Sequence, residues 1–158
     1  MNIQLEVFFA KIYKEEIVFV RKLVDISKKS DNPDLYVDSL VEKLSEKFSI
    51  DKERCVIHST SWRCAHCDLV SLTYLVYSDF LDFGKHKTNS IPITDLSLAE
   101  GTINKPHPTH LEEKHIVSHA LRHLSMLIKK NPQTYKPALM KHSFNSFNSI
   151  AIALAGKI

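Results

Sequence analysis

Histidines are the residues of this chain best suited to chemistry, and three of them recur at helical spacing. His115, His119 and His123 are each four residues apart, so on a helix their rings follow one side. Neighbouring pairs could share a metal ion, whereas the outer two are roughly 12 Å apart along the axis. No glutamate follows them as in a His-Glu-x-x-His metalloprotease motif. We therefore predict no metal here, and a solvated polar stripe is the alternative to a site.

A second group of reactive side chains occupies six consecutive residues, His58-Ser59-Thr60-Ser61-Trp62-Arg63. Strand alternation predicts that His58, Thr60 and Trp62 share one face and that the other three share the opposite face. The hydroxyls and the imidazole could line a pocket for a phosphorylated or carboxylated ligand, with Arg63 holding the anion. The alternative is an ordinary sheet with one solvated face.

These two groups supply the predicted site residues. His58, His119 and His123 are the candidate general acids or bases, because imidazole titrates nearest to neutral pH. The candidate ligand-binding residues are the rest of the polar strand: Ser59, Thr60, Ser61, Trp62 and Arg63. The hypothesis requires the polar strand and the histidine-bearing helix to converge on one concave site.

The cysteines offer a weaker signal. Cys64-Ala65-His66-Cys67 has the spacing of half a zinc site, but Cys55 is the only other cysteine. A hairpin loop with two thiols explains the motif more simply. No cofactor is predicted, although metal content at Cys64 and Cys67, or in the histidine stripe, stays open.

Composition excludes several classes of protein. With only three glycines, none of them clustered, the chain can form neither a P-loop nor a dinucleotide-binding fingerprint. A net charge of +3 does not predict binding to nucleic acid. There is no apolar run long enough to span a bilayer, and the start lacks a secretory signal pattern. We expect a cytoplasmic protein that is not bound to a membrane.

Hydrophobic periodicity predicts the elements that must position these groups. Strands are predicted at 3–24 (two, with a turn at 14–16), 54–63, 69–77 and about 91–94. A hairpin loop at 64–68 joins the middle two. Helices are predicted at 33–49, 111–129, 133–141 and 144–155. Asn32, and a Thr109–Glu112 capping box, would begin the first two helices. The prediction is a single α+β domain over 1–158, with a small mixed or antiparallel sheet packed with helices.

The order of elements up to residue 78 resembles that of the Nudix domain, an α/β/α sandwich, over about half the chain. The resemblance implies Mg²⁺ held by helix carboxylates against a pyrophosphate. In the overlay Glu46 matches the first residue of the Glu-Glu pair, but Lys47, Lys43 and Glu42 replace the second glutamate, the earlier glutamate and the arginine. The opening glycine is also absent. One glutamate flanked by lysines is a weak Mg²⁺ site.

The expected function is therefore a Nudix-like domain with degenerate metal carboxylates that binds a small phosphorylated or nucleotide-like ligand. One alternative is a histidine-dependent hydrolase, with or without metal assistance. Another is an interaction or homo-oligomerisation module, formed by the apolar residues Phe144, Phe147, Ile150, Ile152 and Leu154. The segments 58–63 and 119–124 are also similar to segments of uncharacterised bacterial proteins, which implies no activity.

Overall fold

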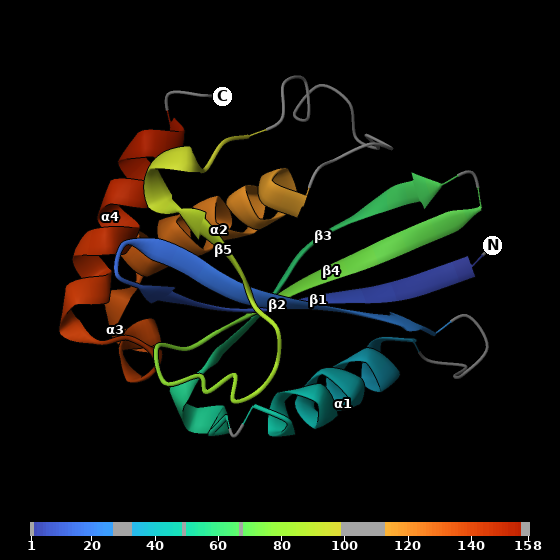
Figure 1. The fold of residues 1–158 in the computed structure, drawn as a ribbon. Helices are drawn as coiled ribbons and strands as arrows, with labels where there is room; N and C mark the ends of the chain where they lie inside the picture. The colour runs from blue at the N-terminus through green and yellow to red at the C-terminus, as the bar shows by residue number, and fades with distance from the viewer. Residues whose placement is uncertain (1, 27–32, 49, 67, 99–112, 156–158) are drawn as a thin grey trace.

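A five-stranded sheet lies at the centre of the fold, with helices on both of its faces (Figure 1). The computed structural model describes residues 2–26, 33–48, 50–66, 68–98 and 113–155; the side chains at 33–38, 40, 52, 60–66 and 155 are outside that description. The sheet is mixed, and the helices pack against it from either side. This arrangement confirms the α+β class predicted from periodicity.

The strands are β1 (Asn2–Tyr13), β2 (Glu16–Asp25), β3 (Val56–His66), β4 (Leu69–Tyr77) and β5 (Asn89–Pro92). Their order across the sheet is β3-β4-β1-β2-β5. β1 pairs in parallel with β4, and the other neighbours are antiparallel. The central position of β1 explains why every residue from Leu5 to Ala10 is buried, on both faces of the sheet.

One face of the sheet is covered by α1 (Pro33–Glu46), and the other by α2 (Glu113–Lys130) and α4 (Lys141–Ala155) (Figure 1). A short helix, α3 (Pro132–Tyr135), connects α2 to α4. Short 3₁₀ helices lie at Lys52–Arg54, Ile93–Asp95 and Lys136–Ala138. None of the described helices is both long and apolar enough to cross a membrane.

Each face has its own apolar core. Under α2 and α4, Phe8 of β1 and Tyr77 of β4 pack with Leu121 and Phe147. Under α1, the other side of β1 packs against the helix and against Phe48 after it, whose ring lies 4.6 Å from the ring of Phe9. The two helical layers are thus held by alternate residues of the same central strands.

The C-terminal apolar segment contributes to the first of these cores. Phe147, Ile150 and Leu154 are buried there, and Phe144 packs partly against it. Ile152 is 70% exposed. Most of the apolar side chains considered for oligomerisation therefore cover the core of their own chain.

A buried tyrosine ties this layer to the sheet. The Tyr77 hydroxyl donates to Asp79 Oδ1 at 2.6 Å and accepts from the Ile12 backbone N–H at 3.2 Å. Asp79 Oδ2 accepts from the Met140 N–H at 2.7 Å, just before α4. Burial, and then the Asp79 carboxylate, raise the pKa of Tyr77 well above its ordinary value. The tyrosine therefore stays a neutral donor at physiological pH.

The predicted elements are present, with corrected limits. The predicted hairpin loop at 64–68 is wrong in extent, because β3 continues through His66 and pairs with Leu69. The predicted helix 133–141 is α3 followed by a 3₁₀ turn, as expected where Pro137 removes a backbone donor. The predicted caps, Asn32 and Thr109–Glu112, lie outside the described residues.

The turn of the first hairpin contains no Asn-Gly pair. Lys14 and Glu15 both have positive φ, at 49° and 62°. Two consecutive positive φ values are those of the tight turn that suits twisted strands. The register of the long β1–β2 ladder fixes this turn, although lysine and glutamate disfavour it.

Candidate functional site

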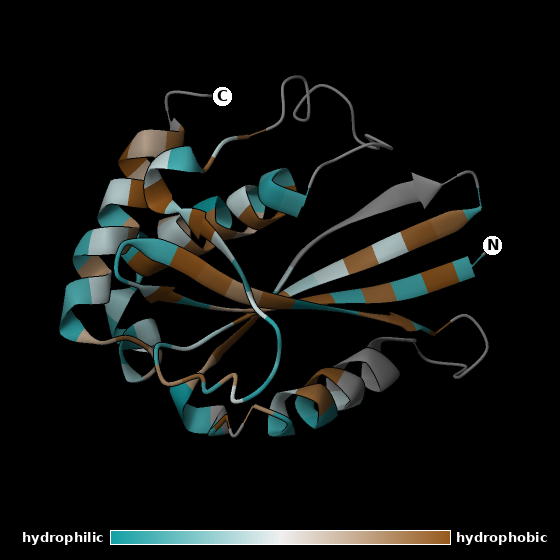
Figure 2. Cartoon of the chain, in the orientation of Figure 1, coloured by the Kyte–Doolittle hydropathy of each residue, from teal (hydrophilic) through white to brown (hydrophobic). Residues whose placement is uncertain are grey.

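The sheet face that α2 crosses changes from apolar to polar along the strands. Beyond Phe8 and Leu75, the next positions on this face are Glu6 paired with Thr73, and then Gln4 paired with Ser71. Figure 2 shows this start of β1 as alternating hydrophilic and hydrophobic residues. Cross-strand partners share a face, so these polar residues form one patch. We call Gln4, Glu6, Ser71 and Thr73 the polar half-face.

Glu6 is the charged residue of the polar half-face, and it is buried. Its side chain has no exposed surface, and it accepts a hydrogen bond from the Thr73 hydroxyl at 2.7 Å. Arg21 of β2 binds the same carboxylate through Nε, at 2.7 Å, and through Nη2. Arg21 Nη1 also lies 3.6 Å from Glu113 at the start of α2. The buried charge is thus paired, and it joins two strands to the helix.

The polar strand and the histidine-bearing helix meet at His58 and His123. His58 pairs with Leu75 in the sheet, and its Nε2 lies 3.1 Å from Nδ1 of His123 on α2. A hydrogen bond between two imidazoles needs a proton on one nitrogen and a lone pair on the other. When both rings are neutral, one outer nitrogen is therefore a donor and the other an acceptor. The pair can relay a proton by exchanging tautomers.

The surroundings favour a neutral imidazole at His58. Burial lowers the pKa of His58, and the neighbouring His123 lowers it further. His58 is half-buried, while His123 is exposed. One ring of the pair therefore borders the sheet, and the other is open to a ligand or to water.

His119 lies one turn before His123 on α2 and is half-buried. Burial, then Arg122 and then His115 lower the pKa of its imidazole. His119 is therefore also neutral near pH 7. The structure brings His58 and His123 into contact and places His119 on the adjacent turn of the same helix.

The predicted alternation along β3 is wrong beyond Ser59. A register shift between Ser59 and Ser61 makes Ser61 the partner of Thr73 and Arg63 the partner of Ser71. These two positions then belong with that of His58, whose partner is Leu75, and not with Ser59. A bulge of this kind leaves no mark in the composition of a strand.

Most of the ligand-binding roles predicted for the outer half of β3, residues 59–63, are not tested by the structure. Ser59 is exposed and pairs with Tyr74, which packs on the α1 side of the sheet. The side chains of Thr60, Ser61, Trp62 and Arg63 lie outside the described part of the structure. Their roles as ligand-binding residues remain predictions.

The described part of the chain contains no cluster of metal-ligating side chains. No three histidine, cysteine or acidic side chains there are grouped as a metal site requires. Glu42 and Glu46 are exposed on α1. Cys67 and the side chain of Cys64 lie outside the description, so the Cys-x-x-Cys prediction is not tested.

Sequence reasoning missed the Glu6–Arg21 pair. Its signal was available: Glu6 stands between Leu5 and Val7 in a strand that is apolar on either side of it. A charged residue in a central strand needs a partner, and Arg21 is the basic residue of the neighbouring strand that shares its face. The pairing required the register of the hairpin, which the sequence pattern did not supply.

Comparisons with protein-family models and with curated proteins found no relative of this chain. No family model matches the chain, and no curated protein matches it either.

Proposed function

We propose that this chain binds a small phosphorylated or nucleotide-like ligand at the His58–His123 contact, beside the polar half-face. The observation that carries the proposal is the contact between His58 and His123, at 3.1 Å. It joins the two segments whose side chains were expected to converge. Ligand sites combine a few polar groups of this kind with an otherwise apolar scaffold.

The groups around this contact suit an anionic ligand. The exposed His123 can donate to a phosphate oxygen, and His119 stands one turn away. The proposal assigns Arg63 to the anion. It leaves out the ring-stacking role predicted for Trp62, because Trp62 pairs with Leu72, which packs on the α1 side of the sheet. Ser61 and Thr60 would complete the polar contacts of the strand, and Ser59 would take part only at its rim.

The proposal includes a Nudix-like domain that works without the metal carboxylates of that family. Its support is the helix on each face of a mixed sheet and the presence of lysines beside Glu46 on and after α1. We further propose that the protein acts in the cytosol.

A thermal-shift screen of nucleotides and phosphosugars tests ligand binding directly. We expect at least one compound to raise Tm in the natural chain and to lose most of that effect in His58→Ala and His123→Ala. His142→Ala, at an exposed position of α4, should keep the full shift. If no compound stabilises the protein, or if the shift survives both site variants, the proposal is wrong.

A histidine-dependent hydrolase is the second candidate, and the same contact favours it. A half-buried neutral imidazole in contact with a second one can accept a proton from water and pass another to a leaving group. The rate of phosphate release from the stabilising compounds would be compared between the natural chain and His58→Gln. General acid–base catalysis predicts a loss of about 10²- to 10⁴-fold in kcat. An unchanged kcat would leave only the binding function.

A further inference from the structure

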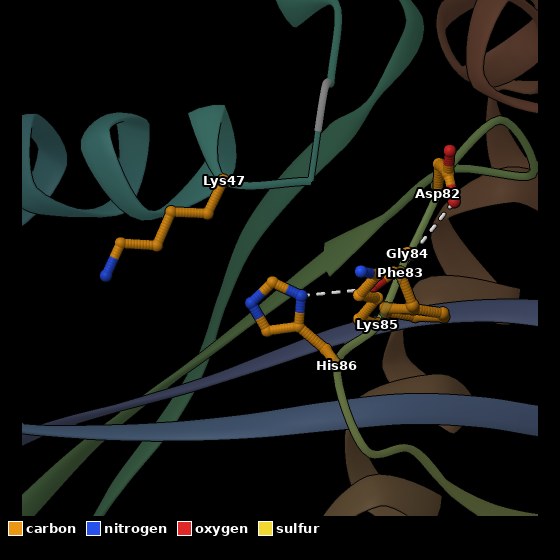
Figure 3. Close-up of a pocket in the computed structure, with 6 residues that line it drawn as sticks. All are labelled: Lys47, Asp82, Phe83, Gly84, Lys85 and His86. Atoms are coloured by element: carbon orange, nitrogen blue, oxygen red, sulfur yellow. Dashed lines mark hydrogen bonds between the residues drawn. The ribbon is translucent and has the colours of Figure 1, made fainter.

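The loop between β4 and β5 forms a hollow with the end of α1, on the other side of the molecule's central strands from the histidine pair. This hollow has a volume of about 350 Å³ and is lined by Lys47, Asp82, Phe83, Gly84, Lys85 and His86 (Figure 3). Lys47 follows α1, and the other five residues come from the loop. Segments distant in the sequence therefore build it together.

Hydrogen bonds within the loop orient His86. Gly84, with a φ of 54°, donates its N–H to Asp82 Oδ1 at 2.9 Å. The Phe83 carbonyl accepts from the His86 backbone N–H at 2.9 Å and faces His86 Nδ1 at 2.9 Å. Because a carbonyl oxygen only accepts, Nδ1 carries a proton.

The other ring nitrogen of His86 is thereby directed into the hollow. In Figure 3, Nε2 lies on the side of the ring that faces Lys47. The ring also packs against buried Phe48, with centroids 4.8 Å apart. An exposed imidazole is thus held in one orientation by backbone and by an aromatic wall, as a preorganised ligand contact requires.

Positive charge exceeds negative charge in this region. Lys47 and Lys85 line the hollow together with one carboxylate, that of Asp82, which accepts the Gly84 N–H. A second hollow of about 400 Å³ shares His86 and adds Lys87 and Lys22.

The other charges of the second hollow offset one another. Arg21 is paired there with Glu6 and lies 3.6 Å from Glu113. The two hollows adjoin at His86, and we call them together the basic trough.

We propose that this trough binds the phosphate chain of a small polyphosphate compound. Two adjoining hollows match an elongated anion better than a single phosphate, and lysines act as mobile point charges along it. Because Nδ1 already carries a proton, Nε2 of His86 would donate to the middle of the chain from the imidazolium form of the ring. Lys47 and Lys87 would lie on either side. This site is separate from the His58–His123 site and does not depend on the function proposed there.

Calorimetric titration with inorganic triphosphate tests the trough. We expect binding to the natural chain and a weakening of about tenfold or more in Lys47→Gln and in His86→Gln. Lys43→Gln is the matched control, since Lys43 is an exposed lysine one turn earlier on α1 and lines neither hollow. Its affinity should match that of the natural chain. Tm measured for each variant confirms that it remains folded.

Four results would overturn the proposal. No heat of binding at millimolar triphosphate removes the site. An equal loss in Lys43→Gln assigns the binding to diffuse surface charge, and orthophosphate binding as tightly as triphosphate removes the elongated ligand. If His58→Ala abolishes triphosphate binding while His86→Gln does not, the anion occupies the histidine-pair site instead.

Discussion

Arg21 of β2 reaches diagonally along the sheet to Glu6 of β1, although its direct partner across the ladder is Phe8. The guanidinium carbon lies 5.9 Å from the Phe8 ring centroid on the way. The diagonal contact leaves Glu6 fully buried and Arg21 at the edge of the helix layer, where it also approaches Glu113. A single arginine thus connects the polar half-face to the start of α2.

Arg21→Ala should destabilise the protein strongly. It removes the guanidinium that pairs with the buried Glu6 carboxylate, which costs about 3 kcal/mol or more in the free energy of unfolding. Urea unfolding would measure the loss. Glu6→Gln combined with Arg21→Ala should restore part of the stability, because no uncompensated charge remains, and Lys129→Ala on the exposed end of α2 should change little. A double variant no more stable than Arg21→Ala would contradict this account.

Stability should fall as the pH is lowered from 7.5 to 5. Burial lowers the pKa values of His58 and His119 below the ordinary 6.5. Above pH 6.5 these two histidines are neutral in both the folded and the unfolded chain, so their full contribution to the free energy of unfolding is present. Below pH 6.5 the unfolded chain binds protons at these histidines more readily than the folded chain does, which favours unfolding. The stabilisation is lost as the pH falls through the lowered folded pKa.

Urea unfolding of His58→Gln at both pH values isolates this contribution. The variant should show a smaller difference in unfolding free energy between pH 7.5 and 5 than the natural chain does. His142→Gln, at an exposed site, should keep the full difference. A pH dependence that is unchanged in His58→Gln would show that other groups cause it.

Tyr77→Phe should cost about 1–3 kcal/mol, because it removes the hydroxyl that satisfies Asp79 and the Ile12 N–H in the interior. Thermal or urea unfolding measures the loss. Tyr13→Phe is the matched control, since Tyr13 is 54% exposed. Equal effects of the two substitutions would mean that the buried network adds no stability.

Replacing Lys14-Glu15 by Asn-Gly should stabilise the protein by about 1–2 kcal/mol, because both residues now adopt the left-handed conformation that L side chains disfavour. Lys87→Gly, in the exposed loop before β5, lacks this positive φ and should be neutral or slightly destabilising. The comparison of unfolding midpoints checks the turn. A loss of stability in the Asn-Gly variant would show that the turn side chains make compensating contacts.

Much of the fold follows from local pattern. The alternation in β1, the β-branched and aromatic run in β2 and the helical spacing of Val117, Ala120, Leu121 and Leu124 predict their elements. Limits were less predictable where tertiary pairing decides them, as at the end of β3. His58 of the polar strand lies beside His123 of the helix, while the role of these residues in a site stays a prediction.

By itself, the sequence determined which residue types are present and which faces of each element are apolar. Whether a given imidazole meets another, and which strand position faces the helix, depended on strand order, register and one bulge. Those features arise from contacts between residues far apart in the chain, as between Glu6 and Thr73 or His58 and His123. Local periodicity carries no information about such pairings, because it reports only how each segment divides its own faces.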